Sequence, residues 1–104
     1  MPDLPPIVTA FFSATQTDAV VACFTRDATV RDEHRQHRGI GEIEAWHRDA
    51  MARTPFTARP VLAQPRDGRL VVSAEVSGAF PGSPVILDHS LVLQDGLIAE
   101  LEIG

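Results

Sequence analysis

Apolar side chains recur at helical spacing in the first half of the chain. In residues 5–14 they share one helical face, and the two leading prolines suit a first turn. Residues 17–24 predict a second, shorter helix, with Thr17 or Asp18 able to cap it. A third helix is predicted over 39–54. We expect it to end at Thr54, because the following proline disfavours helical backbone in the residue before it. Its apolar stripe carries Ile43, Trp46, His47, Ala50 and Met51.

The second half of the chain alternates apolar and polar residues between turn signals, which is typical of β-strands. The expected strands are a short one at 28–32 and longer ones at 56–64, 69–78, 84–94 and 97–103, with a polar loop at 33–38. Helices followed by hairpin-linked strands are typical of the α+β class. We therefore expect a single domain over residues 1–104, with three N-terminal helices packed on a curved antiparallel sheet.

The last hairpin can be assigned a register. Asp95-Gly96 is typical of a two-residue type I′ turn, which pairs Gln94 with Leu97. Glu100 and Glu102 need water or partners, so we expect the opposite face to be the inner one. That face would carry Ile86, Asp88, Ser90, Val92, Ala99, Leu101 and Ile103. The expected outer face carries Leu87, His89, Leu91, Leu93, Ile98, Glu100 and Glu102.

Two carboxylates are expected to point inward. Alternation places Asp88 on the inner face of the hairpin, and it groups Asp32 with Ala28 and Val30 on the apolar face of the short strand. A buried aspartate is costly unless it is paired, hydrogen-bonded or protonated. Two of them in one apolar site predict a divided pair, with one ionised as a base and the other protonated as a donor. Alternatively, either carboxylate bonds a backbone N–H or an arginine at a strand end.

Charge and composition exclude several classes of function. The chain has nine arginines, no lysine and a formal charge of −5, which argues against a nucleic-acid binder. We expect no metal, because arginines flank the acidic and histidine residues of the 33–38 loop, and we expect no cofactor. No stretch has the length of a membrane span, and the first residues do not resemble a signal peptide. We therefore expect a cytoplasmic protein that does not bind membranes.

The segment Phe24-Thr25-Arg26-Asp27-Ala28-Thr29-Val30-Arg31-Asp32, followed by Gly39-Ile40 at a helix start, resembles the nuclear transport factor 2-like superfamily. Its members include SnoaL-like polyketide cyclases and ketosteroid isomerases. The resemblance implies a cone of bent sheet around three helices, with a pocket at the open end. Residues 27–32 are similar to the ketosteroid isomerase segment whose last Asp is the general base. Asp88-His89 is similar to the pair whose Asp is the protonated oxyanion donor. This chain has no tyrosine, the main oxyanion donor of that enzyme.

The resemblance implies a small-molecule pocket protein of the SnoaL-like type. We expect a cofactor-free isomerase, cyclase or dehydratase that acts on an apolar carbonyl-containing ligand, with Asp32 as the base and Asp88 as the donor. A non-catalytic ligand-binding or dimeric accessory domain is the alternative. We also expect a homodimer through the apolar outer face of the sheet. The expected ligand contacts are Phe11, Phe24, Val30, Trp46, Phe56, Ile86, Ser90 and Leu101.

Overall fold

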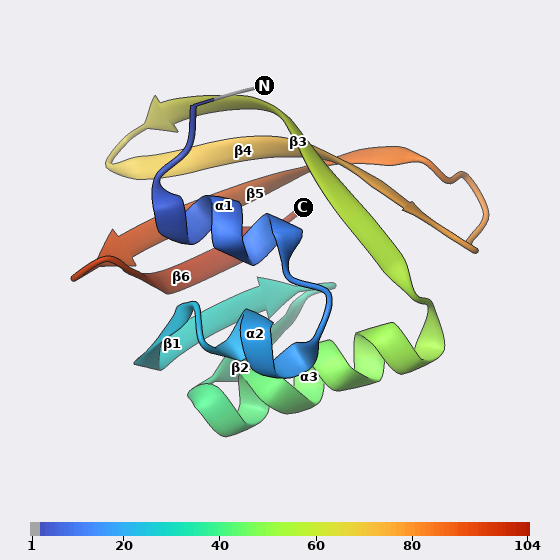
Figure 1. Ribbon diagram of the computed structural model, residues 1–104, viewed down its shortest axis with the longest axis horizontal. Coiled ribbons are helices and arrows are strands. Elements are labelled where there is room, and N and C mark those ends of the chain that lie inside the picture. Colours follow the sequence, from blue (N-terminus) through green and yellow to red (C-terminus); the bar gives the residue numbers. More distant parts are fainter. Residues whose placement is uncertain (1–2) are drawn as a thin grey trace.

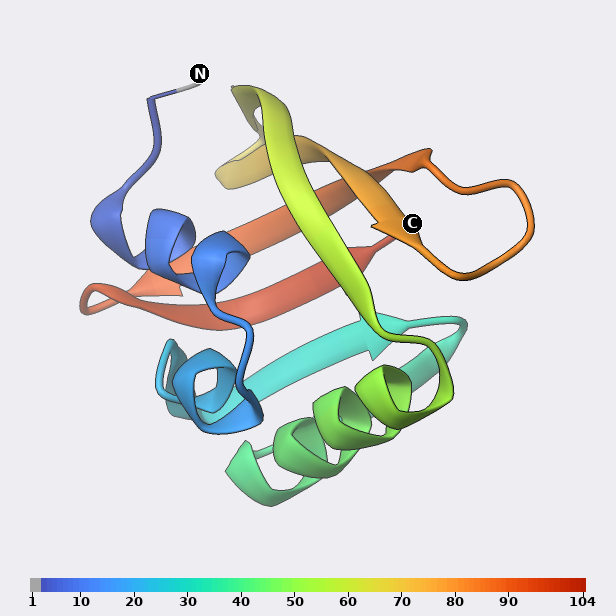
Figure 2. The ribbon, with the colours of Figure 1, turned by 45° about the vertical axis from the view of Figure 1, so that its right-hand side comes forward.

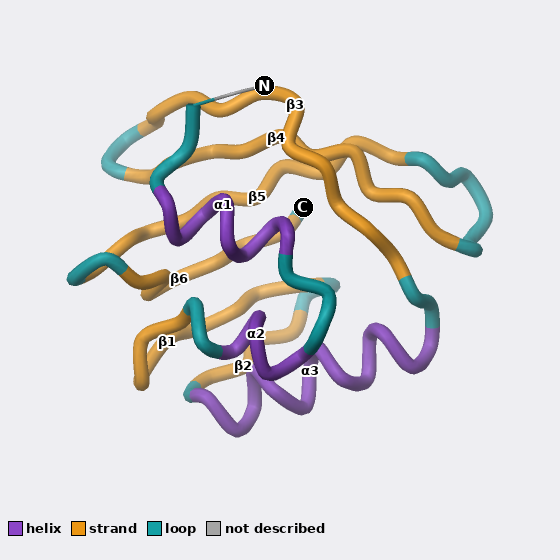
Figure 3. Tube along the Cα trace, viewed as in Figure 1, coloured by secondary structure: helices purple, strands orange, loops and turns teal. Residues whose placement is uncertain are grey.

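Three helices lie along one side of a bent sheet in a computed structural model, which describes residues 3–104 (Figures 1 and 3). The first two residues of the predicted domain lie outside the described part. The elements are α1 (Pro6–Ser13), α2 (Thr17–Val21), β1 (Phe24–Asp32), β2 (Arg35–Arg38), α3 (Ile40–Arg53), β3 (Phe56–Arg66), β4 (Arg69–Gly78), β5 (Val85–Gln94) and β6 (Leu97–Ile103).

The sheet has the strand order β2-β1-β6-β5-β4-β3 across residues 3–104. All neighbouring strands are antiparallel except β1 and β6, which run parallel. The predicted α+β class is confirmed, and the curved sheet is mixed rather than wholly antiparallel. Figure 2 shows the bend, in which β3 leaves the end of α3 and crosses in front of the other strands. The helices lie inside this curve, and α3 packs on β1 and β2.

The third helix forms where the apolar periodicity predicts it. Gly39 precedes it with φ +84°, a left-handed conformation that glycine adopts without steric cost. Ile43 is fully buried and Trp46 is 9% exposed, because both face the sheet. Glu42 in the first turn accepts a hydrogen bond from the backbone N–H of Arg38 (2.8 Å), which ties the helix start to β2. This helix therefore presents an aromatic and apolar face to the interior.

The segment predicted to be a polar loop instead forms the edge strand β2. Glu33 and His34 both have positive φ (53° and 65°) and join β1 to β2 as a two-residue turn. Two-residue turns of this kind are usually recognised by an Asn-Gly or Asp-Gly pair, because non-glycine residues adopt positive φ less often. The chain has Glu-His at this position, so the sequence did not predict the turn. The first strand is also longer than predicted, because Phe24 begins β1 rather than continuing α2.

The register predicted for the last hairpin holds for only two residue pairs. Asp95 and Gly96 have positive φ, and Gln94 pairs with Leu97 as expected. Leu93 pairs with Ile98, but Val92 then pairs with Glu100. Ala99 therefore has no partner and is an extra residue in β6. A bulge of this kind shifts every later pair by one residue.

The bulge exchanges the two faces that were assigned to β5. His89 and Leu91 point inward with exposures of 4% and 1%, whereas Asp88 is exposed and Ile86 is 56% exposed. Glu100 and Glu102 still face out, which the bulge permits. The inward orientation predicted for Asp88 is therefore wrong.

The apolar patch on which the homodimer was predicted is also misplaced. Leu91 and Ile98 belong to the buried core, and Leu87 and Leu93 share their face of the sheet. They form the interior that packs against the helices, so they offer no outer surface to a second copy.

No helix within residues 3–104 has the length and apolarity that crossing a membrane requires.

Candidate active site

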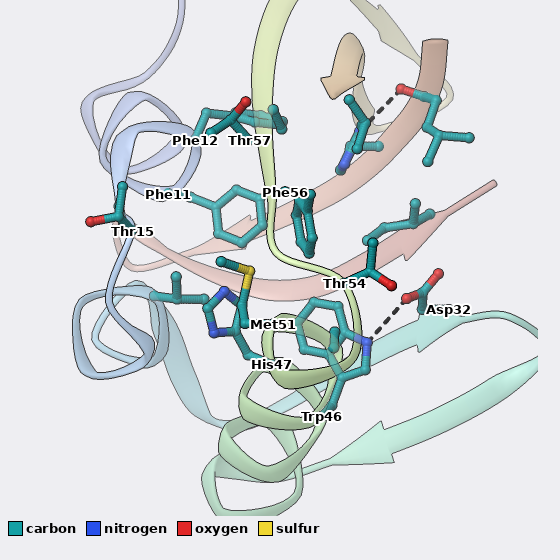
Figure 4. Close-up of a pocket in the computed structure, with 18 of the residues that line it drawn as sticks. Phe11, Phe12, Thr15, Asp32, Trp46, His47, Met51, Thr54, Phe56 and Thr57 are labelled. Carbon is teal, nitrogen blue, oxygen red and sulfur yellow. Dashed lines mark hydrogen bonds between the residues drawn. The ribbon is translucent and has the colours of Figure 1, made fainter. Parts of the chain in front are cut away.

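A cavity of about 390 Å³ lies between the helices and the concave face of the sheet. This volume is within the range of about 300–1,000 Å³ that is usual for small-molecule sites. Apolar and aromatic side chains form most of its wall, and Figure 4 shows several of them converging on one space. The aromatic members of the lining are Phe11, Phe12, Trp46, Phe56 and Phe80.

Asp32 presents a carboxylate to this cavity from the last position of β1. The indole Nε1–H of Trp46 donates to Asp32 Oδ2 at 3.1 Å, so one oxygen is held and the other is left for a ligand (Figure 4). The carboxylate is half-buried, and the ion pairs within residues 3–104 do not include it. Asp32 is therefore oriented but not neutralised, as a general base requires.

His89 is the second titratable group of the cavity, and it comes from the middle of β5. It was predicted on the outer face opposite Glu102, but the bulge turns it inward, where it is 4% exposed. Its Nδ1–H donates to the carbonyl of Leu87 (3.1 Å), which leaves Nε2 as the acceptor of the neutral ring. The ring of Phe12 meets it edge-on, with centroids 5.0 Å apart.

Burial sets the charge state of His89. Removal from water lowers the pKa of its imidazole, because the charged form loses solvation. Hydrogen bonds with backbone groups, and the negative charges of Asp32 and Asp88, oppose this effect without reversing it. At neutral pH the imidazole of His89 is therefore neutral.

A second buried histidine, His47, lines the same cavity from α3. It is 6% exposed, and its Nδ1 shares a hydrogen bond with the Thr17 hydroxyl at 2.9 Å. The predicted apolar stripe of the third helix includes His47, and the structure buries this residue with a side-chain hydroxyl as its partner. Burial lowers the pKa of His47, and the neighbouring Arg48 charge lowers it further.

Charged residues mark the rim of the cavity. Arg53, at the end of α3, contacts Asp49 through Nε at 3.0 Å and lies 3.9 Å from Glu33. All three side chains are more than half exposed, so these pairs add little to stability. Across residues 3–104, no three His, Cys, Asp or Glu side chains form a group that could hold a metal ion.

The structure brings together only part of the predicted site. Asp32, Phe11, Trp46 and Phe56 line the cavity. Phe24, Val30 and Leu101 do not line it, because they are core residues with exposures of 4%, 0% and 1%.

The other predicted site residues lie on the outer face of β5. Asp88 accepts a hydrogen bond from the hydroxyl of Ser73, its cross-strand neighbour, at 2.7 Å. Ser90 accepts one from Arg69, and Ile86 is exposed. Sequence reasoning missed the cavity position of His89. The signal that could have revealed it is the row of leucines at 87, 91 and 93, which shares its strand face and requires burial.

Comparisons with known proteins place this geometry in context. No protein-family model matches the sequence, and no curated protein matches it. A crystal structure from Sinorhizobium meliloti, provisionally described as a polyketide cyclase, is 41% identical; the match covers 98% of this chain and 96% of that one, with a TM-score of 0.91.

Two further solved structures share the fold at lower identity. A Catenulispora acidiphila protein with a ketosteroid isomerase-like fold, in complex with trimethylamine, is 20% identical over 98% of this chain and 86% of that one, with a TM-score of 0.83. A SnoaL-like isomerase candidate from Agrobacterium tumefaciens is 13% identical over 93% and 92% of the two chains, with a TM-score of 0.74. The identity and coverage of the Sinorhizobium match, on the fold described above, show that the chain belongs to the nuclear transport factor 2-like superfamily and to its SnoaL-like proteins.

Proposed function

We propose that this protein is a cofactor-free proton-transfer enzyme that acts on a small apolar carbonyl compound. The observation that carries the proposal is the Asp32 carboxylate, which Trp46 Nε1–H holds at 3.1 Å on the edge of a cavity with a mainly apolar wall. A positioned carboxylate in such a site can remove a proton from a carbon next to a carbonyl group. The family includes polyketide cyclase and isomerase descriptions, which agree with this class of reaction.

Asp32 acts as the base. Its free oxygen takes the proton, the C–H electron pair forms a C=C bond, and the carbonyl π pair moves onto oxygen. Return of the proton from Asp32 to a different carbon, with the carbonyl C=O re-formed, completes an isomerisation. In a cyclisation the new carbon nucleophile attacks a second carbonyl within the same molecule. The first C=O then re-forms, and the alkoxide made at the second carbonyl takes the proton back from Asp32. Each route begins with the same C–H cleavage and leaves the enzyme unchanged.

His89 occupies the inward position on β5 that the sequence assigned to Asp88, but it offers an acceptor there rather than the predicted donor. Its Nδ1–H is used by the Leu87 carbonyl, so Nε2 can accept a hydrogen bond or a proton from a substrate hydroxyl. Burial lowers the pKa of the ring, so a proton taken up there is readily returned to the substrate. Asp32 thus serves as the base and neutral His89 as a proton carrier.

Hydrogen–deuterium exchange tests the proposal. The probe is 2-tetralone, an apolar bicyclic ketone with acidic protons next to its carbonyl, and proton NMR in D₂O follows their loss. We expect the protein to accelerate exchange and Asp32→Asn to reduce the acceleration by about 100-fold or more, as is usual for loss of a general base. Asp88→Asn is the matched control and should exchange like the unaltered protein.

Two results would count against this function. Equal acceleration by Asp32→Asn would remove Asp32 from the reaction. Binding of the ketone without acceleration by the unaltered protein would favour the alternative, a ligand-binding domain without catalysis.

A further inference from the structure

His47 is a buried polar residue of the cavity that the proposed proton transfer does not use. Only 6% of it is exposed, yet its ring belongs to the cavity wall. Burying a polar ring is unfavourable unless its nitrogens have partners. The environment of both nitrogens therefore decides what this side chain can do.

One nitrogen of the His47 ring is occupied and the other is available. Nδ1 lies 2.9 Å from the Thr17 hydroxyl oxygen. Among residues 3–104, no other group bonds the ring, and no buried side-chain nitrogen or oxygen there lacks a partner. Nε2 must therefore be accessible, and the accessible space beside this ring is the cavity. A ligand atom in the cavity is its natural partner.

The form of the ring defines which ligand group fits it. Burial and the charge of Arg48 lower the pKa of His47, so the ring is neutral at pH 7 and does not attract an anion as an imidazolium would. If the Thr17 hydroxyl donates to Nδ1, Nε2 carries the hydrogen and donates to the ligand. If Nδ1 donates instead, Nε2 accepts. A hydroxyl group satisfies both arrangements, whereas a carbonyl oxygen satisfies only the first.

His47 and the reacting carboxylate lie at different ends of the cavity. In Figure 4, Asp32 lies on one side of the Trp46 indole and His47 lies on the other, beside Met51. The rings of Trp46 and His47 have centroids 6.0 Å apart, and the indole nitrogen bonds Asp32. The indole therefore separates the two polar groups. Of the apolar lining residues labelled in Figure 4, Met51 and Phe11 lie on the His47 side of the indole.

We propose that His47 is a specificity-determining residue that binds a hydroxyl group on the substrate, at the end remote from the reacting carbon. The substrate class is then an apolar ring compound with a carbonyl group at one end and a hydroxyl group at the other. The assignment of the ends rests on the proposed function, which places the reacting carbon at Asp32. Thr17 is the positioning residue that fixes the ring of His47.

Two matched ligands test this inference. 6-Hydroxy-2-tetralone places a hydroxyl opposite the ketone, and 6-methyl-2-tetralone replaces that hydroxyl with a methyl group of similar size. Their dissociation constants are measured from the shift of the indole N–H signal of Trp46, the sole tryptophan of the chain, in nitrogen–proton NMR spectra. We expect the unaltered protein to bind the hydroxy compound about tenfold more tightly.

Variants show whether His47 causes that preference. His47→Leu should abolish it, and His47→Gln should restore part of it because an amide still hydrogen-bonds. Asp88→Asn, on the outer face of the sheet, should leave it unchanged as the control. Equal affinities in the unaltered protein would overturn the proposal. So would a preference that persists in His47→Leu, or an effect of equal size in Asp88→Asn.

The outcome separates this inference from the proposed function. Asp32→Asn should lose proton exchange and keep the preference for the hydroxy compound. If exchange is absent but the preference depends on His47, the proposed reaction fails and the hydroxyl site stands. If exchange depends on Asp32 while the preference is absent, the hydroxyl site fails and the reaction stands.

Discussion

The hydrogen bond between Trp46 and Asp32 can be removed with little change of shape. Trp46→Phe keeps an aromatic ring on the same face of α3 and deletes the indole N–H that lies 3.1 Å from Asp32 Oδ2. The carboxylate then loses the one side-chain donor that orients it within residues 3–104. Stability and proton transfer should both fall, for separable reasons.

The size of the stability effect follows from two contributions. A buried hydrogen bond to a charged group contributes about 1.5–3 kcal/mol, and the half-burial of Asp32 reduces this to about 1 kcal/mol because water can replace the donor. The smaller ring leaves part of a buried site unfilled; complete truncation of a buried tryptophan costs about 3–5 kcal/mol, so this part costs about 1 kcal/mol. We expect a total loss of about 2 kcal/mol.

A double-mutant cycle isolates the hydrogen bond from the packing. Urea unfolding, followed by far-ultraviolet circular dichroism, is measured for the unaltered protein, Trp46→Phe, Asp32→Ala and the double variant. The two substitutions should be non-additive by about 1 kcal/mol. Exchange of 2-tetralone in Trp46→Phe should slow by about tenfold, because the base is no longer held in place. Additivity within about 0.3 kcal/mol would refute the reasoning, since the bond would then contribute nothing in solution.

Two further predictions follow from the orientations of Asp88 and His89. Asp88→Ala should change the 2-tetralone exchange rate by less than about twofold and lower the free energy of unfolding in urea by less than about 1 kcal/mol. The reason is that the Asp88 side chain faces outward and bonds only Ser73 among the described residues. A large loss of exchange would return Asp88 to the site. The free energy of unfolding should fall as the pH drops below about 6.5, by up to about 1.4 kcal/mol per pH unit for each buried histidine. Burial lowers the pKa of His47 and His89 in the folded protein, so the unfolded chain binds more protons than the folded one in this pH range. His89→Phe should weaken this dependence when urea unfolding at about pH 7.5 is compared with that at about pH 5.5, and an unchanged dependence would contradict the burial of a neutral ring.

Local patterns in the sequence carried the helices and most of the strands. The helical periodicity around Ile43 and Trp46 predicted α3, and the Asp95-Gly96 pair predicted the last turn with its first residue pair. These features depend on neighbouring residues, so a single sequence contains the information. The position of Asp32 on the inner face of β1 followed from alternation in the same way.

Tertiary packing alone decided which residues of β5 reach the cavity. A strand repeats every two residues, so the one extra residue at Ala99 moves Asp88 outward and His89 inward. Strand alternation is equally regular in both registers, and the choice depends on which face of β5 the helices cover. Burial of the leucines on the His89 face makes the bulged register favourable, because burying apolar surface outweighs the disruption of one pair in the ladder. The cavity, its second histidine and the hydroxyl of Thr17 beside His47 come from segments that only the folded chain brings together.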